Sequence, residues 1–270
     1  MHRNGLLSEE LEILEEIEFK AEKKVYIQIN QNNRIRSLRI KECGIDKLPN
    51  NIDRLKFLKS LTIKEKTLTK LPESIGNLPD LKNLIIYESS ISNLPKTLTK
   101  LNNLEEFRLS RSNIDSFPEI ICNLKNLDTL SLNENKLYEI PNCFGNLDKL
   151  QYIFLNNNNL RNLPDLICNL KKIDTLSLND NEITKLPEKI GDITNLGTLK
   201  LKNNKLESLP DSFSELKLLG GLDLSGNRFK EFPEVLRKLD LYELDISENL
   251  IKEFPKKLKN IKLKEDGKYI

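Results

Sequence analysis

The sequence contains no tryptophan and a single histidine, His2. Because His2 lies at the extreme N-terminus, we do not expect catalysis by a histidine base. No apolar run approaches the roughly 20 residues that a membrane helix needs, and residues 1–19 hold no signal-peptide core. Neither of the glycine-rich phosphate loops, G-x-x-x-x-G-K-[ST] and G-x-G-x-x-G, is present. We therefore expect no cofactor and no enzymatic activity.

Cysteine and surplus charge are also scarce. The four cysteines, Cys43, Cys122, Cys143 and Cys168, form no Cys-x-x-Cys pair, so we expect no metal site. The net charge is +2 and the pI is about 8.2, which is too balanced for a nucleic-acid-binding surface. These features favour a protein of a reducing, intracellular compartment.

The chain does have proline at a regular interval. Nine prolines from Pro49 to Pro233 are spaced by 23 residues, Pro255 follows after 22, and Pro79 alone lies outside the series. Aligning on this series gives ten repeats, of which the first begins at Ile35 and the tenth at Leu241. Self-similarity at such a period is the signature of a repeat protein. Positions are numbered below from the first residue of each repeat.

The sixth repeat, LQYIFLNNNNLRNLPDLICNLKK, follows the frame L-x-x-I-x-L-x-x-N-x-L-x-x-L-P-x-x-I-x-x-L. This frame resembles the leucine-rich repeat family, whose signature is L-x-x-L-x-L-x-x-N/C-x-L. The form LPxxIGNLxxL, present as LPESIGNLPDL at 71–81, is similar to the 23-residue Ras-group and bacterial subclass. The resemblance covers residues 35–258 and implies an α/β leucine-rich repeat solenoid. In that right-handed βα superhelix a curved parallel sheet forms the concave face, and short helical or 3-10 segments form the convex face.

The alternation of apolar and polar residues explains the frame. In LDTLSLNEN, residues 127–135, the period of two is typical of a strand. We expect Leu130 and Leu132 to point inward and Thr129 and Ser131 to face solvent. One repeat cannot bury its own apolar face, so neighbouring repeats must stack. The proline at position 15 suits the first residue of the outer helical segment, where its missing N–H is no loss.

Position nine predicts a structural asparagine ladder in repeats five to ten, made of Asn135, Asn158, Asn181, Asn204, Asn227 and Asn249. Buried backbone that leaves a sheet needs hydrogen-bond partners, which these amides can supply. Of the run Asn156–Asn159, only Asn158 belongs to this column, and we expect the other three to be exposed. Position nine holds Cys43, Lys66, Ser89 and Ser112 in the first four repeats. We expect Lys66 to turn toward solvent in a distorted second repeat, since a buried lone charge is costly.

The two ends are expected to be caps within one structural domain. Residues 1–34 should form an N-terminal cap, with a helix at 8–24 begun by Ser8 as its N-cap and a strand at 25–29. The expected buried stripe of that helix is Leu11, Leu14, Ile17 and Ala21. Residues 259–270 should form a C-terminal cap and tail, with Ile261 and Leu263 in a last strand. Secreted members of the resembled family carry disulfide-rich caps, which this chain cannot form. We therefore expect a cytoplasmic protein, although secretion by a non-classical bacterial route stays open.

The outward positions of the concave face are the candidate partner-binding residues. Apolar side chains occur there as Ile85 and Tyr87 in repeat three and as Tyr152 and Phe154 in repeat six, with Arg108 and Arg111 between them. Aromatic residues with arginine are typical of binding hot spots. The alternative interpretation is that single exposed apolar residues are common and carry no function.

Charge on the expected concave face changes along the chain. It begins basic, with Arg36, Arg39 and Lys41, and ends acidic, with Asp223 and Asp245 at position five of neighbouring repeats. A graded field would orient a partner and speed its association. The alternative is a charged, merely solvated face. Asp223 and Asp245 could also hold a cation or a partner lysine.

The expected function is that of a non-enzymatic protein–protein interaction module, a scaffold or adaptor that binds a protein partner on its concave face. The resemblance suggests a small GTPase or its regulators as one partner class. Alternative interpretations are a targeting or sensor module of a signalling complex and a secreted bacterial protein that interacts with a host.

Overall fold

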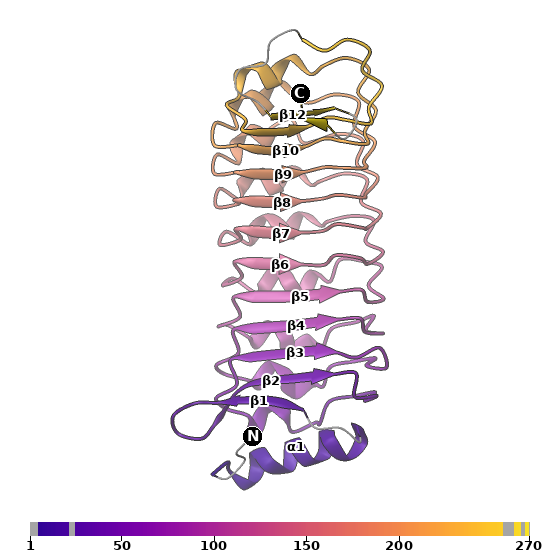
Figure 1. Ribbon diagram of the computed structural model, residues 1–270. Helices are drawn as coiled ribbons and strands as arrows, with labels where there is room; N and C mark the ends of the chain where they lie inside the picture. Colours follow the sequence, from indigo (N-terminus) through magenta and orange to yellow (C-terminus); the bar gives the residue numbers. More distant parts are fainter. Residues whose placement is uncertain (1–4, 22–24, 256–261, 266–267, 270) are drawn as a thin grey trace. The chain divides into compact units, whose positions relative to one another are not determined.

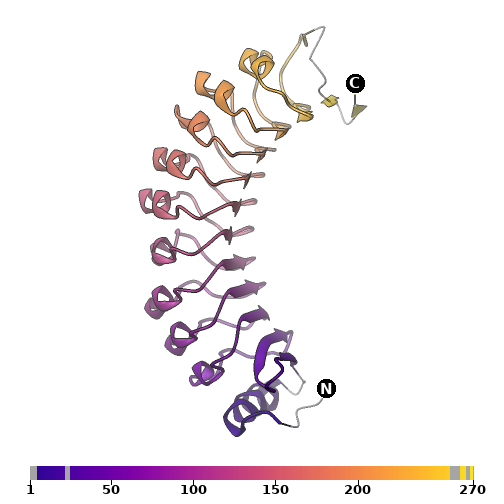
Figure 2. The same ribbon diagram turned by 90° about the vertical axis from the view of Figure 1, so that its left-hand side faces the viewer.

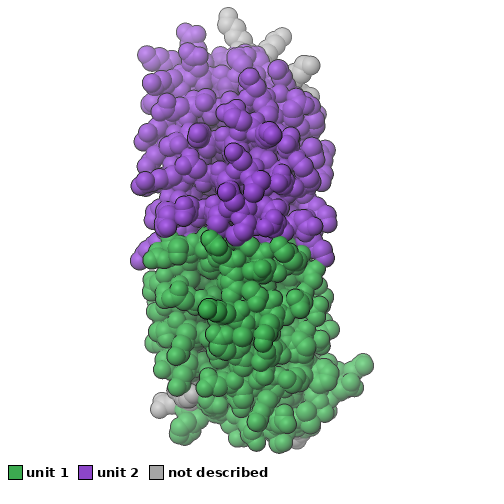
Figure 3. Space-filling model, turned by 180° about the vertical axis from the view of Figure 1, so that it is seen from behind, with its two compact units in different colours: residues 1–135 green, residues 136–270 purple. Residues whose placement is uncertain are grey.

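The computed structural model describes residues 5–21, 25–255, 262–265 and 268–269. The chain divides into two compact units, residues 1–135 (unit 1) and 136–270 (unit 2), which Figure 3 shows in different colours. The units are described one at a time, and the single structural domain expected from the sequence stays a prediction.

Unit 1 contains an α-helix followed by alternating strands and 3-10 helices. Strands β2 to β6 pair in parallel, and β1 pairs antiparallel with β2 (Figure 1). Partners in the parallel register lie 23 residues apart, as Leu61 and Leu84 do. In chain order the elements are α1 (Ser8–Ala21), β1 (Tyr26–Ile29), β2 (Ile35–Lys41), η1 (Ile52–Arg54), β3 (Ser60–Lys64), η2 (Glu73–Asn77), β4 (Asn83–Tyr87), η3 (Lys96–Lys100), β5 (Glu106–Ser110), η4 (Glu119–Asn123) and β6 (Thr129–Ser131).

Unit 2 repeats the same alternation. Strands β7 to β12 pair in parallel, and β13 pairs antiparallel with β12. Strand β12 includes Leu263, as expected, whereas Ile261 lies outside the described residues. The elements are η5 (Asn142–Asn146), β7 (Tyr152–Phe154), η6 (Asp165–Asn169), β8 (Thr175–Ser177), η7 (Ile190–Asp192), β9 (Thr198–Lys200), η8 (Asp211–Glu215), β10 (Gly221–Asp223), η9 (Glu234–Lys238), β11 (Glu243–Asp245), β12 (Lys262–Glu265) and β13 (Lys268–Tyr269).

In each unit the strands form one wall and the 3-10 helices form the other (Figure 2). The frame leucines fill the space between the walls, and Leu130 and Leu132 are fully buried, as predicted. Thr129 and Ser131 are buried as well, contrary to expectation. They still occupy outward positions of the strand, but the Ser131 hydroxyl is hydrogen-bonded to that of Ser110 at 3.2 Å. We call the outward side of the strands in each unit its strand face.

The proline at position 15 does not begin the helical segment. Pro72 is extended, with ψ 152°, and precedes η2 as its N-cap. Its carbonyl accepts the N–H of Ile75 at 3.1 Å. Pro95 and Pro164 do the same for η3 and η6. The predicted helix start was therefore one residue too early. Proline suits the N-cap, whose backbone is extended and whose N–H is not needed.

The N-terminal cap differs from the prediction in two details. Helix α1 has its first helical bond from the N–H of Leu11 to the carbonyl of Leu7, at 3.0 Å, so Leu7 is the N-cap instead of Ser8. The Glu10 carboxylate reaches back to the N–H of Leu7 at 3.4 Å and accepts the N–H of Ile35 at 3.1 Å. Leu14 and Ile17 are buried as expected, but the third buried apolar residue of the described part is Ile13, and Leu11 is half-buried. The described helix ends at Ala21, and residues 22–24 lie outside the described part.

Candidate functional site

The turn after each strand sets the geometry of the strand face. At position eight, the backbone adopts the left-handed conformation, with φ between 51° and 65°, in every described repeat except the second. Unit 2 places Asn157, Asp180, Asn203 and Gly226 there, which are residue types that tolerate this conformation, and also Glu248, which is less suited to it. Unit 1 places Glu42, Glu88, Arg111 and Glu134 there, which are less suited to it. Side chains at position eight therefore lie along the edge of the strand face, where those of neighbouring repeats can contact one another, as Glu88 and Arg111 do.

The asparagine ladder at position nine is confirmed. Asn158 is buried, and its Nδ2 donates to the carbonyls of Leu155 at 3.1 Å and Asn156 at 3.3 Å. Its Oδ1 accepts the N–H of Leu137 at 3.1 Å. Asn135, Asn181, Asn204 and Asn227 are buried in the same way, and Asn249 is half-buried with equivalent bonds. Each amide therefore ties the backbone of its own repeat to that of the preceding one.

The neighbours of Asn158 are less alike than predicted. Asn157 and Asn159 are exposed, as expected, although Asn157 is in the left-handed conformation. Asn156 is half-buried, and its Oδ1 accepts the Ser177 hydroxyl at 2.7 Å and the N–H of Asn179 at 2.8 Å. The expectation that Asn156 is merely exposed was wrong, because its amide takes a backbone donor of the next repeat.

Repeat two replaces the ladder asparagine with a carboxylate. Lys66 at position nine is exposed, as predicted, and the preceding residue, Glu65, is buried instead. Its Oε2 accepts the N–H of Cys43 at 2.6 Å and that of Gly44 at 2.9 Å, and its Oε1 accepts the Thr67 hydroxyl at 2.9 Å. Glu65 thus accepts backbone donors of the preceding repeat, as a ladder asparagine does. Its donors are at positions nine and ten, whereas Asn158 accepts the N–H at position 11. The sequence signal for this replacement was Glu65 itself, a side chain with acceptor oxygens one residue before position nine.

Repeats three and four use serine at position nine. The buried hydroxyls of Ser89 and Ser112 are hydrogen-bonded to each other at 2.7 Å. The N–H of Ser112 donates to Oδ1 of Asn135 at 3.2 Å, so the ladder of later repeats begins there. Serine makes part of the expected bonding, as predicted.

The strand face of unit 1 carries an apolar pair, Ile85 and Tyr87, on strand β4. Both side chains are half-buried and alternate with the fully buried Leu84 and Ile86 of the same strand. In register, Ile85 lies between Thr62 and Arg108. The pair therefore faces solvent, Ile85 from the middle of β4 and Tyr87 from its last residue, as the alternation predicted.

One edge of this pair is lined by a charge ladder, which we define as Glu42, Lys64, Glu88, Arg111 and Glu134. Lys64 Nζ lies 2.6 Å from Glu42 and 3.4 Å from Glu88, and Lys64 is in register with Tyr87. Arg111 lies 3.4 Å from Glu88 and 2.7 Å from Glu134. The hydrogen bond to Glu42 is the main cause that raises the pKa of Lys64, and Glu134 does the same for the pKa of Arg111. Five alternating charges are thus held side by side next to Tyr87.

The other edge of the pair is also polar and internally bonded. The Glu106 carboxylate accepts Nδ2 of Asn83 at 2.8 Å and Nε of Arg108. Arg108 is on the strand face, as predicted. Arg111 is not in a strand but in the turn after β5, where it is exposed and belongs to the charge ladder. Unit 1 therefore places Ile85, Tyr87 and Arg108 on its strand face and Arg111 in the charge ladder at its edge, and their role in binding stays a prediction.

The other predicted residues lie in unit 2. Tyr152 is 40% exposed and Phe154 is half-buried on strand β7, in register with Thr175 and Ser177 of β8. Neither points into the core, which Ile153 of the same strand occupies. A second apolar pair therefore faces solvent in this unit.

Asp223 and Asp245 are in register on neighbouring strands β10 and β11, as predicted. Oδ1 of Asp223 accepts the N–H of Ser225 at 3.0 Å and its hydroxyl at 2.6 Å. Oδ1 of Asp245 accepts the same groups of Ser247, at 3.1 and 2.5 Å. One oxygen of each carboxylate is therefore engaged in closing its own turn, which weakens the case for these residues as a partner site.

Sequence reasoning missed two exposed tyrosines on the strand faces. Tyr26 of β1 is 60% exposed and in register with Arg39. Tyr242, which precedes β11, is 62% exposed, and its ring covers Gly220, where an added Cβ would lie 2.2 Å from a ring carbon. The sequence signal for Tyr242 was Gly220, at position two of the preceding repeat, because a residue without a side chain leaves room for the tyrosine ring.

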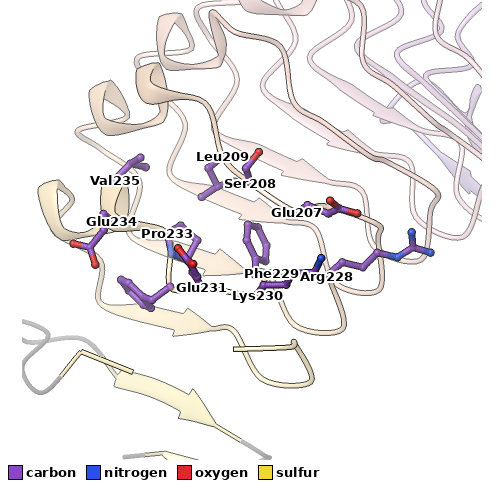
Figure 4. Close-up of a pocket in the computed structure, with 11 residues that line it drawn as sticks. Glu207, Ser208, Leu209, Arg228, Phe229, Lys230, Glu231, Pro233, Glu234 and Val235 are labelled. Carbon is purple, nitrogen blue, oxygen red and sulfur yellow. The ribbon is translucent and has the colours of Figure 1, made fainter. Parts of the chain in front are cut away.

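The cavities that the structure describes are shallow features of the repeats. The larger cavity described, about 370 Å³, follows the chain from Arg228 to Val235 beside Glu207 and Leu209 (Figure 4). A cavity of about 190 Å³ occupies the equivalent positions of repeats six and seven, near Leu163 and Pro187. Because such cavities recur at the same frame positions, they follow from the repeat geometry and do not indicate a dedicated active site.

Groups that could act as metal ligands, nucleophiles or membrane anchors were also sought. Among the described residues, no cluster of three histidine, cysteine or acidic side chains could hold a metal ion. Burial raises the pKa of the free Cys168 thiol to about 11, so this thiol stays protonated near neutral pH. No helix in the described part has the length and apolar character of a membrane span.

Comparison with known proteins agrees with the repeat frame. A model described as leucine-rich repeat region matches residues 11–112, and one described as leucine rich repeat matches residues 102–160, 125–183 and 171–229. No curated protein matches the chain.

Three solved structures are similar to this chain in both sequence and fold. A leucine-rich repeat protein of Leptospira interrogans is 31% identical, with a TM-score of 0.75, over 84% of this chain and 65% of its own. A TDR receptor is 26% identical, with a TM-score of 0.74, over 85% of this chain and 42% of its own. The leucine-rich repeat domain of the type III effector XopL is 25% identical, with a TM-score of 0.68, over 76% of this chain and 73% of its own.

The chain spans less than two thirds of the length of the first two of these structures. The two family models together match residues 11–229. Each unit has the strand wall and the helical wall that the repeat frame requires, and unit 2 has the position-nine ladder. The chain belongs to the leucine-rich repeat family.

Proposed function

We propose that this chain is a non-enzymatic protein–protein interaction module, a scaffold or adaptor whose partner binds the strand face of unit 1 around Ile85 and Tyr87. The observation that carries the proposal is an outward apolar pair enclosed on both edges by side chains that are already bonded to one another. Hot spots typically place an aromatic anchor inside a rim of contacts that exclude water. A pre-bonded rim also loses little side-chain entropy when a partner binds.

The backbone of unit 1 supports the same proposal. Glu88 and Arg111 occupy left-handed positions, with φ 53° and 52°, where asparagine, aspartate or glycine would be easier. Such residues cost on the order of 1–3 kcal/mol and tend to persist at functional sites. This strained backbone places the opposite charges of Glu88 and Arg111 within 3.4 Å of each other beside Tyr87.

The test is a matched comparison of two double variants. Ile85→Ala with Tyr87→Ala removes the apolar pair. Leu166→Ala with Tyr138→Ala removes side chains of the same size that are exposed outside the strands. Quantitative affinity capture should show proteins that are lost with the first variant and kept with the second. The affinity of a recovered partner should then fall about 30-fold or more for the first variant, and equal affinity for both variants with intact melting curves would falsify the proposal.

A second candidate function, a secreted bacterial protein that interacts with a host, rests on the type III effector among the similar structures. Recovery of the chain from culture supernatant of its source would favour it over a cytoplasmic scaffold. The small GTPase partner, the sensor role and the cytoplasmic location stay predictions of the sequence.

A further inference from the structure

The strand face of unit 1 has a group of cations that form no ion pair with the carboxylates that the structure describes. Arg36, Arg39 and Lys41 of strand β2 are exposed, and Lys59, just before β3, is half-buried. None of the four forms an ion pair with any residue that the structure describes. We call these four residues the basic cluster.

The remaining cations of this face are paired. Lys64 and Arg111 belong to the charge ladder, Lys82 lies 2.5 Å from Glu105, and Arg108 is bonded to Glu106. Surplus positive charge on the described strand face of unit 1 is therefore concentrated in the basic cluster. Four like charges repel one another, so their grouping favours an anionic partner that relieves the repulsion.

The basic cluster has a fixed relation to the apolar pair. Arg39 is in register with Thr62, which is in register with Ile85. Lys41, Lys64 and Tyr87 are related in the same way. Two strand spacings separate the cations from the apolar side chains, which is about 10 Å. The surface thus presents positive charge and an apolar anchor at a set separation across the strands.

We propose that the partner segment of this face is an acidic stretch of protein followed, about 10 Å away, by an apolar or aromatic side chain. This inference deepens the proposed function and rests on it for the apolar contact. The carboxylates would contact Arg39 and Lys41 while the apolar side chain covers Ile85 and Tyr87. Charge complementarity of this kind chiefly sets association rate and specificity. A protein segment fits better than nucleic acid, because the apolar pair adjoins the cluster and the net charge of the chain is only +2.

The experiment uses the full chain and a fluorescein-labelled peptide of sequence EDEDGGFL, whose two glycines span roughly the required distance when extended. Fluorescence anisotropy compares wild type with Arg39→Glu/Lys41→Glu. The matched control is Lys56→Glu/Lys70→Glu, which makes the same change of charge at exposed positions outside the strands. A second peptide, EDEDGGSS, lacks the apolar end, and a labelled oligo-thymidine provides the nucleic-acid comparison.

We expect the strand-face variant to bind EDEDGGFL about tenfold more weakly at about 0.05 M salt and about twofold more weakly at about 0.5 M, because salt screens exposed charges. The control should change affinity by less than about twofold. Equal losses in both variants, no binding by wild type up to about 1 mM, or tighter cluster-dependent binding of oligo-thymidine would each overturn the inference.

The two proposals can fail separately. If Arg39→Glu/Lys41→Glu weakens binding but Ile85→Ala/Tyr87→Ala does not, the acidic part stands and the apolar site is refuted. EDEDGGSS should then bind as tightly as EDEDGGFL. If only the apolar variant matters, the acidic part of the partner is refuted.

Discussion

Unit 1 and unit 2 close the same turn with different chemistry. Unit 2 uses one solution, an asparagine at position nine, in each of its repeats from Asn158 to Asn249. The first four repeats of unit 1 use Glu65, the pair Ser89 and Ser112, and Cys43, whose N–H is bonded to Glu65. The comparison teaches that the turn requires a buried polar side chain that bonds to a neighbouring repeat, and that more than one residue type can supply it.

The strands differ in length for a related reason. Strands β3 to β5 of unit 1 have five residues each, whereas β7 to β11 of unit 2 have three. In unit 2 the N–H at position seven bonds to a side-chain oxygen, as Asn179 does to Asn156 and Lys202 does to Asn179 at 2.9 Å. In unit 2 these side-chain oxygens take the place of backbone acceptors at position seven, so the strands end after three residues. Unit 1 keeps a longer strand surface at the place where the apolar pair lies.

The largest expected effect is on the carboxylate of repeat two. Glu65→Ala leaves two backbone donors of repeat one, the N–H groups of Cys43 and Gly44, without their acceptor. We expect a loss of about 2–4 kcal/mol in the free energy of unfolding, because orphaned buried donors are costly. Lys66→Ala next to it should stay within about 0.5 kcal/mol. Chemical denaturation would measure both, and similar values for the two would contradict the assigned role of Glu65.

The corresponding change in unit 2 is Asn158→Ala. It removes one acceptor and two donors of the ladder, and we expect a cost of about 1–3 kcal/mol. Asn159→Ala is the control, since its side chain is exposed and its backbone is not in the left-handed conformation. An unchanged melting temperature for Asn158→Ala would refute the ladder.

A smaller effect is expected at the outer asparagine. Asn156→Ala removes the acceptor of the Asn179 N–H and of the Ser177 hydroxyl on a partly solvated surface. The expected cost is about 0.5–1.5 kcal/mol. A cost as large as that of Asn158→Ala would show that the two columns contribute equally to the ladder.

The smallest effect concerns the Cys168 thiol, whose pKa burial raises to about 11. A raised pKa favours folding below the unfolded value, near 8.5, and that contribution is lost as pH rises toward 11. Between about pH 7 and 8 we expect no alkylation of Cys168 by iodoacetamide in the folded chain, and rapid alkylation in denaturant. Peptide mass spectrometry would detect it, and native labelling would contradict the assigned burial.

The sequence was sufficient to predict the residues that recur in every repeat, but not the side chains that replace them in unit 1. Asn158 was identifiable because its column recurs six times, and Ile85 and Tyr87 were identifiable because strand alternation places them outward. The role of Glu65 depends on a partner 22 residues earlier and on a local change of backbone path. The charge ladder depends on left-handed backbone, which turns Glu88 and Arg111 toward each other. Neither can be read from a frame that treats each position by itself.

The 23-residue register of the ladder also bears on how such a chain can change its length. Asn181 donates to the carbonyl of Leu155, and Asn204 donates to the equivalent carbonyl of Leu178. Removing residues 173–195 would place Asn204 next to Leu155 with every donor facing the same kind of acceptor. Gene duplication or loss in whole-repeat steps is therefore tolerated by the interior. A repeat one residue shorter is tolerated too, since Asn249, 22 residues after Asn227, still donates to the carbonyl of Leu224 at 2.9 Å.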